Sequence, residues 1–182
     1  MTTSLHWSYT NGAVVNVDAL LCDFAQVNGG KLYVTGAGIN LLATTPAPPH
    51  PIGLWLGIVV TIPWTATNQM HRLRVSLIDA DNNKVPFAVS PPAGVVIPEE
   101  DQGALLAQFN VGRAPIMQAG EDTLMPVAFP IQAFLPILTS YSVVIEIDGS
   151  EVSRLRFRAV SDPFQGAGSG PAGVGPADLP RF

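Results

Sequence analysis

The sequence predicts an all-β protein in which two antiparallel sheets, with about eight strands in total, pack as a β-sandwich. Seventeen prolines and 17 glycines are spread through the 182 residues, and no window shows a sustained helical apolar period with caps at both ends. Apolar runs are instead short, rich in Val, Ile, Leu and aromatic residues, and separated by turn residues. A chain of this length buries roughly 70% of the surface that its unfolded form exposes, so we expect one domain with a substantial hydrophobic core.

The strongest local signal is a β-hairpin at residues 141–158, where two alternating runs flank an Asp-Gly turn at residues 148–149. An Asn-Gly-Gly turn at residues 28–30 predicts a second hairpin. The other expected strands span residues 19–27, 31–39, 52–62, 71–79, 84–88, 104–111 and 123–134. Pro126 and Pro130 place the last of these at a sheet edge, because proline cannot donate a backbone hydrogen bond to a neighbouring strand.

This pattern divides the chain into three segments. Residues 19–160 form the sandwich domain, residues 1–18 an N-terminal extension, and residues 161–182 a tail rich in glycine and proline. The tail has too little apolar mass to fold alone, and Leu179 and Phe182 follow a flexible spacer near its end. That composition is suited to docking on a protein partner. The alternative is a disordered terminus with chance hydrophobic residues.

Composition disfavours several classes of function. The formal charge is −5, the pI is near 4.9, and only 13% of residues are charged. A chain of this kind lacks the basic face that phosphate contacts require, so we expect no nucleic-acid binding. The longest apolar run, residues 52–62, is about half as long as a transmembrane helix, so we expect no membrane insertion. No secretory signal is visible at the start, and Cys22 is the single cysteine, which together favour a soluble, cytoplasmic protein.

Several short motifs occur in an order and spacing that resemble a known family. They are Cys-Asp-Phe-Ala-Gln-Val at residues 22–27, Gly-Lys-Leu-Tyr-Val-Thr-Gly at 30–36, Ile-Pro-Trp-Thr-Ala-Thr-Asn at 62–68, His-Arg-Leu at 71–73, and the final hairpin with Ile-Asp-Gly at 147–149. Through these motifs, roughly residues 19–160 resemble a bacterial domain family of unknown function that is common in actinobacteria. The resemblance implies a small immunoglobulin-like β-sandwich with no assigned activity. It therefore bears on the fold and not on the chemistry.

Chemistry-bearing residues are sparse, and none forms a pattern typical of a catalytic, cofactor or metal site. His6, His50 and His71 do not stand beside a carboxylate or cysteine at metal-ligand spacing. Cys22 lies in an apolar run, as an inert buried thiol would. We therefore expect a protein that is not an enzyme and needs no cofactor. The acidic turn at residues 79–83 leaves calcium binding as an alternative, provided that further carboxylates gather at the same end of the sandwich. The carboxylates concerned are Glu99, Glu100, Asp101, Glu121 and Asp122.

Five of the nine basic residues stand at alternate positions of two predicted strands. They are Arg72 and Arg74 on one strand, and Arg154, Arg156 and Arg158 on the other. Alternate residues of a strand point to one face, so each set shares a face. In an immunoglobulin-like sandwich the strand at residues 141–148 lies between the two and places Glu146 among the arginines. We therefore expect Arg-Glu-Arg pairing across the strands. The alternative is a docking patch for an acidic partner or ligand.

The predicted strand at residues 52–62 is nonpolar on both faces, and such a strand has to be covered on both. The N-terminal segment covers the second face, or another subunit does. Low charge, sparse chemistry and excess apolar surface favour a module that acts through protein contacts, either with copies of itself or within a larger complex. The alternative function is a small-ligand receptor or an enzyme with a pocket near Trp64 and Asn68. The sequence does not name the partner.

Overall fold

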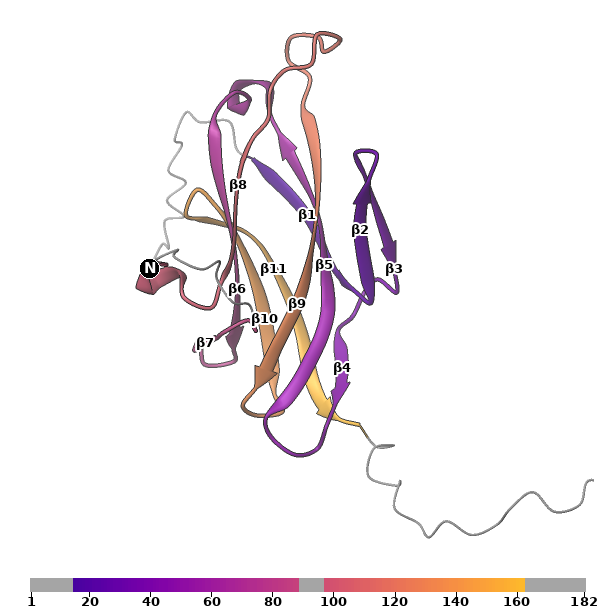
Figure 1. The fold of residues 1–182 in the computed structure, drawn as a ribbon, viewed down its shortest axis with the longest axis vertical. Coiled ribbons are helices and arrows are strands. Elements are labelled where there is room, and N and C mark those ends of the chain that lie inside the picture. Colours follow the sequence, from indigo (N-terminus) through magenta and orange to yellow (C-terminus); the bar gives the residue numbers. More distant parts are fainter. Residues whose placement is uncertain (1–14, 89–96, 163–182) are drawn as a thin grey trace, which may run out of the picture.

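The computed structural model describes residues 15–88 and 97–162, and within them strands dominate (Figure 1). Two short 3-10 helices, η1 (Trp64–Ala66) and η2 (Glu99–Asp101), interrupt the strands. No helix in the described ranges is both long and apolar enough to cross a membrane.

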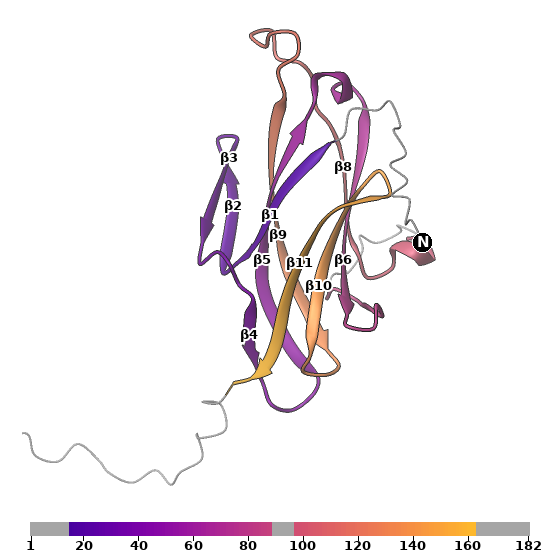
Figure 2. The ribbon, with the colours of Figure 1, turned by 180° about the vertical axis from the view of Figure 1, so that it is seen from behind.

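Two sheets pack against each other, and a separate hairpin stands outside them (Figures 1 and 2). The three-stranded sheet has the order β1 (Asn16–Cys22), β5 (His50–Ile62) and β9 (Thr123–Leu135). The six-stranded sheet has the order β4 (Leu41–Thr44), β11 (Ser150–Ser161), β10 (Ser140–Ile147), β6 (Met70–Asp79) and β7 (Lys84–Val85), and β8 (Leu105–Asn110) also pairs with β6. The hairpin consists of β2 (Phe24–Asn28) and β3 (Lys31–Thr35). All pairings are antiparallel except that of β4 with β11. The predicted all-β sandwich is confirmed.

The hydrophobic core lies between the two sheets and follows from alternation along the strands. In β5, the even-numbered residues from Ile52 to Ile62 are at most 6% exposed. On the opposite sheet, Leu73 and Leu77 of β6 and Val143 of β10 are at most 1% exposed. Full burial of one such aliphatic side chain contributes about 1.5 to 3 kcal/mol. This shared layer therefore holds the two sheets together.

Two features that the sequence predicts are present in the structure. The turn between β10 and β11 has positive φ at both central residues, 52° at Asp148 and 81° at Gly149, as the commonest tight hairpins require. Strand β9 forms an edge of the three-stranded sheet, and its Pro126 and Pro130 lie opposite residues of β5, the only strand that β9 pairs with in that sheet. The predicted edge position of these prolines is confirmed.

The predicted strand at residues 19–27 is wrong as a single strand, because the chain breaks at Asp23. Strand β1 pairs with β5, whereas β2 turns away and pairs with β3. The backbone NH of Asp23 donates to the carbonyls of Thr35 at 3.1 Å and Gly36 at 3.3 Å, which closes the base of the hairpin. Gly36 has a φ of 65°, and a Cβ at this position would lie 2.0 Å from Oδ2 of Asp23. The strand predicted at residues 31–39 therefore ends at Thr35, where glycine lets the chain change direction.

The sandwich also begins earlier than predicted and contains a strand that the pattern did not show. Strand β1 starts at Asn16, and Val17 is 7% exposed and belongs to the core. The last residues of the predicted N-terminal extension are thus part of the sandwich. Strand β4 has only four residues and pairs in parallel with the end of β11. So short a strand is too brief for alternation to identify.

The β2–β3 hairpin covers the middle of the second apolar face of β5 (Figures 1 and 2). Leu32 and Val34 of β3 lie over Gly57 of β5, where an added Cβ would meet their methyl groups at 3.3 and 3.5 Å. Phe24 and Trp55 pack edge to face, with ring centroids 5.1 Å apart. Cover for the middle of this face therefore comes from a hairpin of the sandwich domain itself, which is neither the N-terminal extension nor the second subunit that the sequence analysis considered.

Candidate binding face of the six-stranded sheet

Strands β6, β10 and β11 lie side by side, as predicted, and their outward side chains form one face of the molecule. In their register, Glu146 of β10 lies opposite Arg74 of β6, and Val144 lies opposite Arg154 of β11. Alternation brings all five predicted arginines to this face. We call it the arginine face, and its arginines are Arg72, Arg74, Arg154, Arg156 and Arg158.

Arg72 and Arg74 are neutralised by acids within the fold. Asp101 of η2 has a side chain that is 1% exposed, contacts Nη2 of Arg72, and lies 3.3 Å from Nε of Arg74. Arg74 also pairs with Glu146 through Nη1 and donates from Nη2 to the carbonyl of Glu100 at 2.7 Å. The expected pairing of Glu146 with an arginine of β6 is confirmed. These two arginines hold η2 against the sheet, so their role is structural.

The other half of the expected Arg-Glu-Arg arrangement is wrong. Arg154 lies opposite Val144, and the pairing of β10 with β11 then shifts register between Ile145 and Glu146, so that Glu146 lies opposite Glu151. Arg154 forms a two-point ion pair with Glu151, with Nε–Oε1 and Nη2–Oε2 distances of 2.8 and 2.7 Å. Alternation along a strand does not reveal such a bulge, which is why the sequence misassigned the partner of Arg154.

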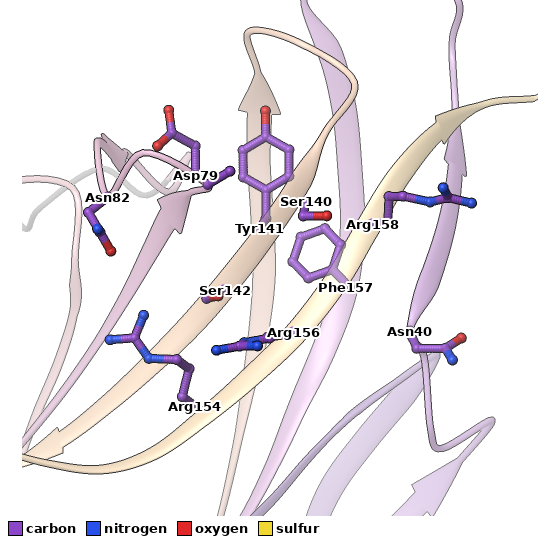
Figure 3. Close-up of a pocket in the computed structure, with 11 residues that line it drawn as sticks. Asn40, Asp79, Asn82, Ser140, Tyr141, Ser142, Arg154, Arg156, Phe157 and Arg158 are labelled. Carbon is purple, nitrogen blue, oxygen red and sulfur yellow. The ribbon is translucent and has the colours of Figure 1, made fainter.

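Arg156 and Arg158 are exposed and have no salt bridge or hydrogen-bonded acid within the part of the chain that the structure describes. Together with Arg154 they line an open pocket of about 510 Å³ (Figure 3). The pocket lies where β6 ends and β10 begins, and we call it the arginine pocket. Its polar lining also includes Asn40, Asp79, Asn82, Ser140 and Ser142.

The arginine pocket is hollow because β10 carries small side chains between longer neighbours. Ser140 and Ser142 are the outward residues of β10 at this end, and they pair in register with Arg158 and Arg156 of β11. Tyr141 and Phe157 also line the pocket, are at most 2% exposed, and stack with ring centroids 5.8 Å apart. The pocket therefore lies directly over closely packed core side chains.

Asp79 is the only acid among the described residues that line the arginine pocket, and its carboxylate is hydrogen bonded within its own turn. Its Oδ1 accepts hydrogen bonds from the backbone NH groups of Asp81 and Asn83, both at 2.9 Å, and its Oδ2 accepts from the Asn83 side chain at 3.0 Å. The side-chain hydrogen bond from Asn83 is the main cause that lowers the pKa of Asp79. Within residues 15–88 and 97–162, no group of three or more His, Cys, Asp or Glu side chains could hold a metal ion.

The other candidate residues that the structure describes make internal contacts. Nδ1 of His50 lies 2.7 Å from the carbonyl oxygen of Thr45, and both ring nitrogens of His71 are hydrogen bonded. Cys22 is fully buried, and burial is the main cause that raises the pKa of its thiol. The remaining candidates, His6, Leu179 and Phe182, lie outside the described residues.

The loop around Trp64 and Asn68 is held by Arg113, a residue that the sequence analysis did not single out. The Arg113 guanidinium lies 4.2 Å from the centroid of the Trp64 ring and donates to the hydroxyl of Thr67 at 2.7 Å and the carbonyl of Trp64 at 3.0 Å. The backbone NH of Asn68 donates to the carbonyl of Val111 at 2.8 Å. These groups are engaged with one another, which favours a structural role for this loop. A single arginine in a loop carries no sequence pattern that would have revealed this.

Together these observations define a β-sandwich domain whose larger sheet presents a row of arginines beside a pocket. The chain belongs to DUF6941, a family of unknown function, whose profile matches residues 17–160. The match runs from the second residue of β1 to the penultimate residue of β11, so the family corresponds to the sandwich. The expected membership of an uncharacterised domain family is confirmed. A comparison with curated proteins finds no match.

Proposed function

We propose that this protein is a non-enzymatic binding module that acts through protein contacts at the arginine pocket. The observation that carries the proposal is the pair Arg156 and Arg158, which are exposed, lack an acidic partner in the described chain, and border a hollow. Arginine is enriched at protein interfaces because its planar guanidinium presents five donors and is weakly hydrated.

The other three arginines of the arginine face already pair with acids, which supports a binding role for Arg156 and Arg158. Arg72 and Arg74 share the buried Asp101, and Arg154 is paired with Glu151. The two arginines that remain concentrate positive charge at one place on a chain whose formal charge is −5. A local charge opposite to that of the whole surface guides the approach and orientation of an acidic partner.

The lining of the pocket supports binding more than catalysis. Its described residues include arginine, asparagine and serine but no histidine, lysine or cysteine. A serine nucleophile requires an adjacent base, and Asp79 is the only carboxylate among the described residues of the lining, with its oxygens hydrogen bonded within its own turn. Groups of this kind can hold an anion by hydrogen bonds and charge.

Further parts of the proposal rest on the sequence. The partner is a second copy of the chain or a component of a larger complex, and Leu179 and Phe182 of the tail provide an additional docking segment. The sandwich is of the immunoglobulin-like type and comes from a bacterial, actinobacterial family that works in the cytoplasm. The immunoglobulin-like type is supported by the two packed sheets and by the predicted order of β6, β10 and β11.

Selection from a phage library of random peptides would test the proposed function, with the full chain as the immobilised target. The wild type should enrich peptides rich in Asp and Glu, and the double variant Arg156→Glu with Arg158→Glu should lose that enrichment. Lys31→Glu is the matched control, because Lys31 is an exposed cation on the β2–β3 hairpin, away from the arginine face. A wild type that enriches no acidic peptides, or a charge-reversed variant that enriches them equally, would contradict the proposal.

A further inference from the structure

The two arginines of the arginine pocket that have no acidic partner in the described chain point to different sides of β11. Figure 3 shows the Arg156 side chain extending over β10 toward Ser142, whereas Arg158 extends away from β10, on the side of Asn40. Arg156 and Ser142 lie opposite each other in the register of β11 with β10. Directly opposite residues of an antiparallel pair carry neighbouring side chains on one face of the sheet. Arg156 and Ser142 therefore serve the same part of the pocket, which Arg158 does not share.

Arg154 extends from β11 to the same side as Arg156, but its charge is already neutralised (Figure 3). A guanidinium group has five N–H donors. Nε and Nη2 of Arg154 donate to the two carboxylate oxygens of Glu151, at 2.8 and 2.7 Å. Arg156 therefore supplies the one positive charge on this side of β11 that no acid of the described chain neutralises.

The charge and the donors on this side of the pocket match a single carboxylate. A guanidinium binds a carboxylate through two parallel hydrogen bonds, and the Ser142 hydroxyl and the Asn82 amide add neutral donors. A phosphate group carries a charge of about −1.5 to −2, which exceeds the single charge of Arg156. Asp79 also lines the pocket, and because its pKa is lowered by the hydrogen bond from Asn83, it is ionised at neutral pH and repels further negative charge.

The floor of the pocket favours a side-chain carboxylate over the free carboxylate at the end of a chain. Terminal carboxylates are captured by nests of backbone NH groups. Strand β10 forms the floor and pairs with β6 on one edge and β11 on the other, so its backbone groups are already engaged. Recognition at this place therefore depends on side chains that stand on the sheet.

We infer that one Asp or Glu side chain of the partner protein enters the arginine pocket on the β10 side of β11 and pairs with Arg156, not with Arg158. This inference rests on the proposed function, and it names the group that the pocket recognises and the arginine that recognises it. The Ser142 hydroxyl donates to the same carboxylate. Arg158 adds only long-range attraction, which salt screens.

NMR titration of the full chain with N-acetylglutamic acid α-amide tests the inference, because this probe carries one side-chain carboxylate and no other charge. At about 0.15 M salt, the Nε–H signal of Arg156 and the amide signal of Ser142 should shift and saturate, and the Nε–H signal of Arg158 should not. Arg156→Gln should weaken binding about fivefold or more, the factor expected when one exposed ion pair is lost. Arg158→Gln should weaken it less than about twofold, because a screened charge contributes little.

Two controls isolate the charge and the place. N-acetylglutamine α-amide has nearly the same shape without the charge and should cause no saturable shift. Lys31→Gln removes an exposed cation away from the arginine face and should leave the affinity unchanged.

Each other outcome overturns the inference in a distinguishable way. Equal shifts at Arg156 and Arg158, with equal losses in their glutamine variants, would show that the two arginines act together, and the proposed function would stand. Tighter binding of N-acetylphosphoserine α-amide would identify a phosphate site, and tighter binding of N-acetylglycine would identify a site for a terminal carboxylate. If none of these probes binds saturably, the inference fails, and the library selection shows separately whether the proposed function fails with it.

Discussion

Nδ1 of His71 lies 2.7 Å from Oδ2 of Asp148, while its Nε2 lies 2.8 Å from the carbonyl oxygen of Ala66. Both partners accept hydrogen bonds, so both ring nitrogens have to donate, and only the imidazolium form of histidine carries two N–H groups. His71 is 5% exposed, and its ring lies 5.3 Å from that of Phe109. A buried cation therefore joins β6 to η1 and to the turn between β10 and β11.

The protein is expected to lose stability as the pH rises above about 6.5. Burial of the ring acts to lower the pKa of His71, but the hydrogen bonds to Ala66 and Asp148 and the charge of Asp148 outweigh it and raise the pKa above 6.5. A raised pKa in the folded state gives stability that is fully present below about pH 6.5 and is lost as the pH rises through the folded pKa. Thermal melts from about pH 5.5 to about pH 9 should show this fall in the wild type and not in His71→Gln. A wild-type melting temperature that stays constant or rises over this range would contradict the prediction.

Asp148→Asn should separate the charge of Asp148 from its place in the turn. Asparagine tolerates the φ of 52° and keeps an oxygen for the backbone NH of Arg72, which lies 2.8 Å from Oδ1. We expect a loss of about 1 kcal/mol in the free energy of unfolding and a downward shift of the His71 titration midpoint followed by NMR. An unchanged midpoint would show that Asp148 does not raise the pKa of His71.

The same pair has an effect on the acid side. Burial acts to raise the pKa of Asp148, but the hydrogen bonds from His71 and Arg72 outweigh it, and the pKa is lowered below 3.8. The resulting stability is present above about pH 3.8 and is lost as the pH falls through the folded pKa. Asp148→Asn has no carboxylate at this position, so it should lose less stability than the wild type as the pH falls through this range. This smaller loss is an internal control for the variant.

Two arginines of the arginine face should differ in how much they stabilise the fold. Arg74→Gln removes the partner of Glu146 and one of two cations beside the buried Asp101. Because Arg72 still contacts Asp101, we expect a loss of about 2 kcal/mol, less than the full cost of breaking a buried ion pair. Arg156→Gln should change the free energy of unfolding by less than about 0.5 kcal/mol, since its side chain is exposed and pairs with no acid in the part of the chain that the structure describes. Urea denaturation measures both, and equal losses would contradict the division into structural and free arginines.

Gly103 and Gly120 offer a matched test of backbone packing. Gly103 has a φ of 73°, and a Cβ there would lie 2.7 Å from Cβ and 2.8 Å from Cα of Pro86. Gly120 has a φ of 93° but nothing within 4 Å of such a Cβ. We expect Gly103→Ala to cost about 3 kcal/mol or more, because a rigid proline has to move, and Gly120→Ala to cost about 1 kcal/mol from backbone strain alone. Similar unfolding free energies for the two variants would show that the contact with Pro86 is easily relieved.

A chain that ends at Asp162 is expected to keep the melting temperature of the full chain. It retains every strand that the structure describes and the hydrogen bond from the Asp162 NH to the carbonyl of Thr44 at 2.8 Å. The composition of the tail predicts no contribution to a core, whereas Leu179 and Phe182 predict a contribution to association. Size-exclusion chromatography should therefore reveal a change in association without a change in stability. A drop of several degrees in the melting temperature would show that the tail belongs to the fold.

The sequence by itself determined the features that depend on short-range pattern. Alternation placed the five arginines on one outward face and Glu146 among them, and the Asp-Gly dipeptide at residues 148–149 specified the hairpin that brings β10 and β11 together. Pro126 and Pro130 marked β9 as an edge strand. These are local consequences of a two-residue period and of backbone geometry, so they can be predicted without knowledge of distant contacts.

Only the tertiary structure decided which arginines of the arginine face pair with which acids. Because of the register shift at Glu146, Arg154 pairs with Glu151 of its own strand. Helix η2 places Asp101 beside Arg72 and Arg74. The chain likewise breaks at Asp23, so that residues 24–35 form a hairpin over β5 and do not extend β1. Each outcome depends on which groups far apart in the sequence come within a few ångströms of one another. Local alternation contains no information on that choice, because Glu151 is near Arg154 through a bulge that breaks the alternation, and Asp101 lies in a 3-10 helix outside the strands.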